Sequence, residues 1–284
     1  MKLITYLKDH REWTGILADD GASVFPLPYP DMQSIIEAPR EALTAAAGTS
    51  IDSIPLSEVT LLAPIPHPRQ DVICLGINYH AHAEEAARYS AEAFTKERPI
   101  PIYFSKRVTE AVPPEGFIES HPGLVERLDY EVELAVIIGK TGRNIKPEEA
   151  EDYIFGYSVF NDVTARGIQK QHVQWLRGKS LDGYSVMGPA IVHKSQLPFP
   201  LELDISCHVN GELRQQSNTR LLIADIPTII SELSQGMTLE AGDIIATGTP
   251  AGVGLSFDPP RFLKAGDEVI CTVEKVGQLK NRIL

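Results

Sequence analysis

Three acidic residues alternate with apolar ones in the segment Asp129-Tyr130-Glu131-Val132-Glu133, and their spacing could support metal chemistry. In an extended strand, alternate side chains share one face, so neighbouring carboxylates would lie about 7 Å apart at ~3.3 Å per residue. They repel one another unless water or a cation lies between them. A solvent-facing strand edge is the commoner explanation of such a pattern. The alternative is a site for a hard cation such as Mg²⁺, Mn²⁺ or Ca²⁺, which prefers carboxylate oxygens.

A second acidic position follows another apolar stretch. Residues 153–160 have the composition of a strand, and Asn161 and Asp162 come directly after it. An acidic side chain at a strand end could complete a cation site that begins on a neighbouring strand. Asp162 could equally cap the following helix, since Asn and Asp are common N-caps.

His82 and Glu85 are three residues apart in the segment that follows Gly76. On a helix or 3-10 turn this spacing puts them on one face, where the carboxylate can orient the imidazole as a general base. A histidine near a helix start is more often a surface or capping group. His80 and His82 could instead bind a softer metal, but residues two apart on a helix do not face each other.

Two glycine-containing segments could contact a ligand. Gly178-Lys179-Ser180 looks like the end of a phosphate-binding loop, but that loop needs a glycine five positions earlier, where this chain has Val173. Farther along, Gly248, Gly252 and Gly254 would let backbone amides approach a ligand closely. Such a segment is most often only a turn.

The elements that must position these residues fall into two parts. Apolar runs at 3–7, 14–17 and 24–27, separated by turn residues, predict a β-meander, and a helix is predicted over 32–47. The proline-rich segment 63–68 favours an extended linker. We therefore predict a small N-terminal domain over residues 1–68 and a larger domain over residues 69–284.

The larger part is rich in strands. The predicted strands cover residues 71–75, 130–138, 153–160, 201–209, 242–246 and 268–273. Helices are predicted over 83–94 and 225–236, the second with Asp225 as N-cap, Pro227 in its first turn and Gly236 at its end. Because the strands do not alternate regularly with long helices, we expect an α+β, β-rich fold and not a doubly wound sheet.

The composition excludes several classes of partner. The chain has 284 residues and a net charge of −12, which argues against nucleic acid because phosphate contacts need clustered Lys and Arg. The longest apolar stretch, 134–138, is too short to cross a membrane, and the N-terminus turns charged before a signal peptide can form. We therefore expect a cytoplasmic protein with no nucleic-acid or membrane partner. The three widely spaced cysteines are expected to be small buried apolar residues.

Six segments, in order across residues 72–276, together resemble the fumarylacetoacetate hydrolase family. They are GINYHAHAEE, DYEVELAVIIG, GYSVFNDVTAR, GKSLDGYSVMGP, VNGELRQQSNT and GDIIATGTPAGVG. The resemblance implies a mixed β-roll, in which a curved sheet wraps a central helix, with a small N-terminal domain, and it implies a homodimer. Larger members have an additional Asp ligand seven residues before the histidine, where this chain has Leu75. The resemblance is therefore to the shorter, three-carboxylate members.

The resemblance also implies roles for individual residues. Glu131, Glu133 and Asp162 would hold a divalent cation, Mg²⁺ or Mn²⁺ and in some members Ca²⁺, with Asp129 as a neighbour. The resemblance also implies two catalytic roles. His82 and Glu85 would activate water, and Lys179 would stabilise a developing enolate. The remaining implied substrate contacts come from Thr247, Gly248, Thr249, Arg214 and Gln216.

Substrates of such proteins are 2-oxo acids with a further carbonyl group or unsaturation. Our leading prediction is a divalent-metal-dependent hydrolase that cleaves the C–C bond of acylpyruvate-like 2,4-dioxo acids through a metal-stabilised enolate. The alternatives are an oxaloacetate-type decarboxylase and an isomerase or hydratase of a related acid such as 2-hydroxyhepta-2,4-diene-1,7-dioate. A non-catalytic metal or small-molecule binding protein is the alternative from another class, and the intact His82, Glu85 and Lys179 argue against it.

Overall fold

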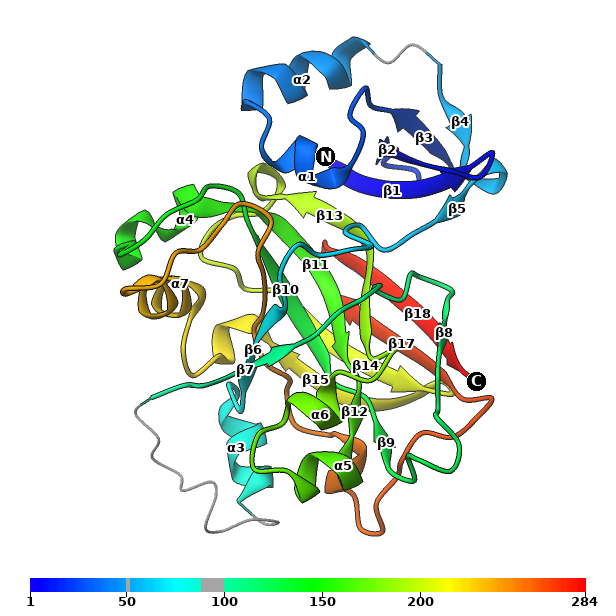
Figure 1. Cartoon of the computed structure of the whole chain (residues 1–284), viewed down its shortest axis with the longest axis vertical. Helices are drawn as coiled ribbons and strands as arrows, with labels where there is room; N and C mark the ends of the chain where they lie inside the picture. The colour runs from blue at the N-terminus through cyan, green and yellow to red at the C-terminus, as the bar shows by residue number, and fades with distance from the viewer. Residues whose placement is uncertain (50–51, 88–99) are drawn as a thin grey trace.

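The N-terminal part of the chain forms the predicted meander. Figure 1 shows the computed structural model, which describes residues 1–49, 52–87 and 100–284. Strands β1, β2 and β3 pair antiparallel in sequence order, which confirms the meander. Their bounds are Lys2–Lys8, Arg11–Leu17 and Ser23–Pro26.

The prediction of one helix over 32–47 is wrong, since the structure has two helices there, α1 (Met32–Ile36) and α2 (Arg40–Thr49). The Asp31 side chain caps α1. Pro39 directly precedes α2, and the residue before a proline is disfavoured in the helical region, which explains the interruption.

The N-terminal strands continue into the main sheet because β1 pairs with β13. The strand order of this sheet is β4-β3-β2-β1-β13-β11-β10-β16-β6-β7, with β5 paired to β1. The strands not yet introduced are β4 (Ile54–Pro55), β5 (Thr60–Leu61), β6 (Val72–Gly76), β7 (Ile102–Lys106), β10 (Val132–Ile138), β11 (Ile154–Asp162), β13 (Ser185–His193) and β16 (Ile244–Ala246). Since strands of both parts share one sheet, the division at residue 68 stays a prediction.

A second sheet packs against the first (Figure 1). Its order is β15-β14-β17-β18-β8, and a separate small pair joins β9 to β12. The bounds are β8 (Phe117–Ile118), β9 (Leu128–Asp129), β12 (Thr164–Ala165), β14 (Asp204–Val209), β15 (Glu212–Asn218), β17 (Glu268–Val273) and β18 (Gly277–Ile283). Parallel pairs occur at β16–β6 and β18–β8, and the other named pairs are antiparallel, so both large sheets are mixed.

Short helices cover the edges and ends of the sheets. The α-helices are α3 (His80–Ala86), α4 (Ala150–Tyr153), α5 (Arg166–Gln171), α6 (Leu176–Lys179) and α7 (Ile226–Ser234). The 3-10 turns are Leu56–Glu58, Pro147–Glu149, Lys194–Gln196, Thr219–Leu221 and Gly254–Ser256. Among the described residues, no helix combines the length and apolar character needed to span a bilayer.

Helix α7 follows the predicted capping signals closely. Asp225 accepts a hydrogen bond from the Thr228 N–H, Pro227 lies in the first turn, and Gly236 follows the helix with a φ of +80°. The other helix predicted in this part, over 83–94, has a described portion that ends with α3 at Ala86, and residues 88–99 lie outside the described residues.

One core cluster joins β10 and β11 to β14, β17 and α7 in the region between the two large sheets. All residues of β10 and β11 are buried, as their apolar sequences predict. Their remaining apolar side chains, including Ile137 and Phe160, belong to a second cluster with residues of α1 and α2. All three cysteines are buried and free, as expected. The α+β, β-rich fold class with mixed sheets is thus confirmed. The strands β10 and β11 also place the acidic residues of the site.

Candidate active site

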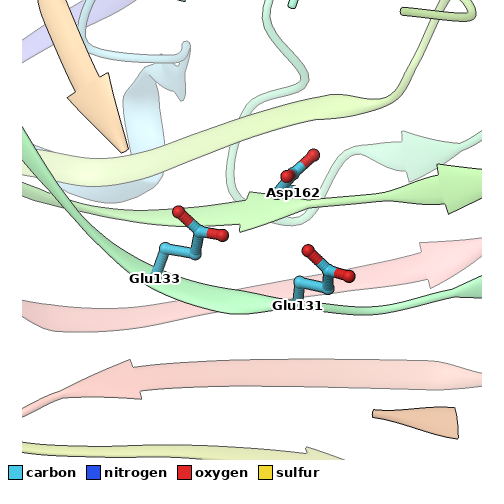
Figure 2. A group of neighbouring side chains, drawn as sticks. All are labelled: Glu131, Glu133 and Asp162. Atoms are coloured by element: carbon cyan, nitrogen blue, oxygen red, sulfur yellow. The ribbon is translucent and has the colours of Figure 1, made fainter. Parts of the chain in front are cut away.

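The three carboxylates implied as metal ligands come together. Glu131, Glu133 and Asp162 each offer an oxygen, and these oxygens lie within 4.8 Å of one another. Figure 2 shows the three carboxylates on the same side of two neighbouring strands. The antiparallel register of β10 and β11 produces this arrangement, since the Asp162 N–H donates to the Glu131 carbonyl oxygen at 2.9 Å. All three side chains are buried, so a solvent-facing strand edge does not explain them. Asp162 is also not an N-cap, because Ala165 holds that position before α5.

Asp129 does not share a strand face with the other two acidic residues, which corrects that part of the sequence interpretation. It belongs to β9, and β10 begins only at Val132. One Asp129 oxygen accepts from the Tyr130 and Gly254 N–H groups at 3.0 and 2.6 Å. The other accepts from the Leu255 N–H and from the Arg166 Nε. Asp129 therefore holds the 254–255 turn in place.

Three buried cations surround the acidic cluster. Lys179 Nζ donates to Glu131 at 2.7 Å and to Asp162 at 2.6 Å. Lys106 Nζ donates to the other Asp162 oxygen at 2.5 Å. The Arg166 guanidinium forms an ion pair with Glu131 as well as with Asp129. Four carboxylates against three cations leave one negative charge in excess when all are ionised.

Glu133 is the one carboxylate of these four that has no cationic partner among the described residues. Its carboxylate accepts a hydrogen bond from the Gly248 N–H at 2.8 Å. Burial, together with the nearby Asp162 and Glu131 carboxylates, raises the pKa of Glu133 well above its ordinary value. Burial also opposes ionisation of Glu131, but Lys179 and Arg166 outweigh it and lower its pKa to about 2.

The donor set fits a hard divalent cation. It offers oxygen ligands only, it is shielded from solvent, and it has one carboxylate that lacks a cationic partner. Mg²⁺, Mn²⁺ and Ca²⁺ all prefer such ligands. Glu131, Glu133 and Asp162 could therefore hold a divalent metal ion.

The predicted dyad is also formed. His82 Nδ1 lies 3.0 Å from Glu85 Oε2 on α3, and the Gly252 N–H donates to Glu85 Oε1 at 3.0 Å. Burial disfavours the Glu85 carboxylate, but the hydrogen bond from His82 and further donors outweigh burial and lower its pKa. An ionised Glu85 holds the proton of neutral His82 on Nδ1, which leaves Nε2 free to accept a proton. His80 is exposed and lines a different cavity, so it forms no metal pair with His82.

A cavity of about 390 Å³ brings these groups together. His82, Glu131 and Lys179 line it, and so does Thr249. Its apolar wall is formed by Leu75, Ala86, Phe104, Trp175, Val253 and Leu255. The rings of Phe104 and Trp175 meet edge to face with centroids 5.3 Å apart. A methyl group at Gly76 would overlap the Trp175 ring, so the end of β6 needs a glycine there.

The turn over Thr247, Gly248 and Thr249 lies against β10. The hydroxyls of Thr247 and Thr249 donate to the carbonyl oxygens of Leu134 and Val132, and Gly248 adopts a φ of +96° that favours glycine. Only Thr249 of the three lines the cavity. Their assignment to the substrate carboxylate stays a prediction.

Two implied pocket residues are not brought to the cavity. Gln216 is exposed, and Arg214 pairs with Glu212 and lies over the Phe257 ring. Gln215, between them, is the buried residue, since adjacent side chains of β15 point to opposite faces. Neither Arg214 nor Gln216 lines the cavity.

Sequence reasoning missed Lys106 and Arg166. Lys106 ends an apolar strand, and a lysine after such a run is more often a solvated end than a buried partner. Arg166 stands four residues after Asp162 in the same conspicuous segment, but spacing alone did not reveal its ion pairs with Asp129 and Glu131.

Comparison with known proteins identifies the class. Residues 71–284 match the family model described as fumarylacetoacetate (FAA) hydrolase, C-terminal. The chain belongs to the fumarylacetoacetate hydrolase family, and the resemblance seen in the sequence is confirmed.

Relatives of known name extend this result. The chain is 49% identical over 228 residues to oxaloacetate tautomerase YisK of Bacillus subtilis, a match that covers 80% of this chain and 74% of the relative. It is 38% identical over 296 residues to mitochondrial oxaloacetate tautomerase Fahd2a of Rattus norvegicus, covering 100% and 92%. A solved fumarylacetoacetate hydrolase from Exiguobacterium antarcticum superposes with a TM-score of 0.83 at 40% identity, covering 100% and 99%. The leading prediction of a C–C hydrolase is not confirmed by these comparisons.

Proposed function

We propose that this protein catalyses the keto–enol tautomerisation of an oxaloacetate-type 2-oxo acid. The observation that carries the proposal is the convergence of His82, Lys179 and Glu131 on one cavity. Glu85 is hydrogen-bonded to His82 behind it, and Glu133 and Asp162 have oxygens within 4.8 Å of Glu131. The names of the two sequence relatives support the choice of reaction. This proposal replaces hydrolysis as the leading reaction and stays within the isomerase alternative.

The residues can divide the reaction among them. A divalent cation held by Glu131, Glu133 and Asp162 would act as a Lewis acid that polarises the 2-oxo group. His82 accepts the proton from C3 at Nε2, while Glu85 holds the opposite nitrogen and stabilises the charge that His82 gains. The C–H electron pair moves to form the C2–C3 double bond, and the developing charge on the C2 oxygen faces the Lys179 ammonium.

The proton balance closes without another reactant. Asp162 and Glu131 outweigh the effect of burial and raise the pKa of Lys179 to about 12, so the side chain stays an ammonium near neutral pH. Lys179 donates a proton to the C2 oxygen, and exchange with water returns one proton to Lys179 and removes one from His82. One proton has then moved from carbon to oxygen, and the reverse sequence regenerates the keto acid.

The test is the decay of the enol form of oxaloacetate, followed by its ultraviolet absorbance. We expect acceleration over a blank that contains Mn²⁺ without protein. Replacing the general base should cost about 10²- to 10⁴-fold, so His82→Gln should be strongly impaired. His80→Gln is the matched control, because this exposed residue lies on the same helix and does not line the cavity. Wild-type rates equal to the blank would refute the proposal.

Hydrolysis of acylpyruvate-like 2,4-dioxo acids is the second candidate. The same His82–Glu85 dyad could activate the water that attacks the distal carbonyl carbon, and the solved relative from Exiguobacterium antarcticum is itself named a hydrolase. Pyruvate release from acetylpyruvate, with Mn²⁺ and with EDTA, tests it. Carbon dioxide release from oxaloacetate tests the decarboxylase alternative in parallel, and tight oxalate binding without any turnover would favour a binding protein.

Assembly and location stay proposals as well. We expect a homodimer, which sedimentation velocity can check. A cytoplasmic location can be checked by cell fractionation.

A further inference from the structure

Two cations at the cavity differ from the others in having no acidic partner. Arg127 and Lys170 line the same cavity as Arg166 and Lys179. Arg166 and Lys179 are buried and bound to carboxylates, whereas Arg127 and Lys170 are exposed. Within residues 1–49, 52–87 and 100–284, neither exposed side chain forms an ion pair. Their charges are therefore available to a ligand.

The backbone places these two cations next to Arg166. The Arg127 carbonyl oxygen accepts from the Arg166 N–H at 2.9 Å, next to the β9–β12 pair. Lys170 follows Arg166 by four residues in α5, so it lies on the same helix face, about 6 Å farther along at ~1.5 Å per residue. Arg166 itself reaches Glu131. Arg127 and Lys170 thus neighbour Arg166, and they are exposed whereas Arg166 is buried against the cluster.

We infer that Arg127 and Lys170 bind the distal carboxylate of the substrate and make the site selective for 2-oxo dicarboxylates. The inference rests on the proposed function, which puts the 2-oxo end of the substrate at Glu131 and Lys179. A carboxylate at the other end of a short acid would then reach toward Arg127 and Lys170. Arginine and lysine both bind carboxylates through charge-assisted hydrogen bonds.

Electrostatics supports the same assignment. Arg127 and Lys170 line the cavity and form no ion pair with a carboxylate among the described residues. They therefore attract a dianion more strongly than a monoanion. Gln169 and His172 also line the cavity, but Arg127 and Lys170 are the exposed lining residues that carry the full positive charge that a second carboxylate needs.

A binding experiment tests this without catalysis. L-malate and L-lactate both present a 2-hydroxy acid, and only malate has a distal carboxylate. Titration of Mn²⁺-loaded protein should show tighter binding of malate. Arg127→Gln and Lys170→Gln should each reduce malate affinity about 10- to 100-fold, the range expected for a lost charge-assisted hydrogen bond, and leave lactate affinity unchanged. Arg143→Gln is the matched control, because Arg143 is exposed and does not line the cavity.

Equal loss of malate and lactate binding would overturn the inference, because it would indicate a general charge effect. Unchanged malate affinity in both variants would overturn it too. A second assay compares kcat/KM for tautomerisation of oxaloacetate and of phenylpyruvate, where only the oxaloacetate value should fall in Arg127→Gln. If malate selectivity depends on Arg127 and Lys170 but no 2-oxo acid is tautomerised, the dicarboxylate subsite stands and the proposed function fails.

Discussion

Replacing Asp129 by asparagine should destabilise the protein strongly although the residue holds no metal. Its two oxygens accept four hydrogen bonds, from the N–H groups of Tyr130, Gly254 and Leu255 and from Arg166 Nε. Each oxygen accepts two of them. Whichever way the amide of Asp129→Asn is turned, its NH₂ group therefore faces two donors.

The magnitude follows from those two lost bonds. A buried donor left without a partner costs about 1–3 kcal/mol, and the charge opposite Arg166 is lost as well. We expect the free energy of unfolding to fall by about 3–5 kcal/mol, measured by urea denaturation with circular dichroism. The control is Asp225→Asn, since Asp225 caps α7 through one hydrogen bond and asparagine caps equally well. That variant should stay within about 0.5 kcal/mol of the wild type.

The same variant separates a supporting role from a ligand role. All four acceptor positions of Asp129 are used by N–H donors, so Mn²⁺ affinity of Asp129→Asn should change only a few-fold at a temperature where it stays folded. Activity should fall, because the held turn includes Leu255 of the cavity wall and directly follows Val253. Equal stability of the Asp129→Asn and Asp225→Asn variants would refute this reasoning.

Three further predictions follow from the site. Glu131→Gln should weaken Mn²⁺ binding by at least about tenfold, while the wild type stays folded in EDTA because its apolar core packs without the ion; loss of circular dichroism in EDTA would contradict this. Because the pKa of Glu133 is raised, an incoming cation must displace a proton, so Mn²⁺ affinity should rise with pH until that pKa is passed. Calorimetric heats that do not vary with the ionisation enthalpy of the buffer would show that no proton is released. Gln215→Ala should lower the free energy of unfolding by about 2–4 kcal/mol, since the buried amide of Gln215 makes three hydrogen bonds. Gln216→Ala should lower it by less than about 0.5 kcal/mol, because Gln216 is exposed. Equal urea midpoints for the two variants would show that Gln215 is not the residue of β15 that faces the core.

Local patterns in the sequence were sufficient for many elements. The meander, the buried strands β10 and β11 and the capped helix α7 each follow from a period, a turn signal or a cap that spans only a few residues. Such signals are readable because side-chain spacing and backbone geometry decide them without distant contacts. Family motifs then indicated the acidic cluster, the dyad and Lys179.

Some local signals were interpreted incompletely. Pro39 could have divided the predicted helix over 32–47, since proline disfavours helix in the preceding residue. The alternation through Asp129 was taken as one strand, although Asp129 pairs with a different small sheet from Glu133. Sequence alternation does not say which partner strand each residue meets.

The sequence by itself determined the chemistry available to this protein, namely the oxygen ligands, the imidazole base and the ammonium, because residue types and short spacings carry that information. The tertiary structure decided which of these groups meet. Strand register set Asp162 beside Glu131, and burial turned Lys106 and Arg166 into partners of the acidic cluster. The tertiary structure also places Gln215, and not Gln216, on the buried face of β15. Register and burial depend on contacts between segments far apart in the chain, so no short stretch of sequence specifies them.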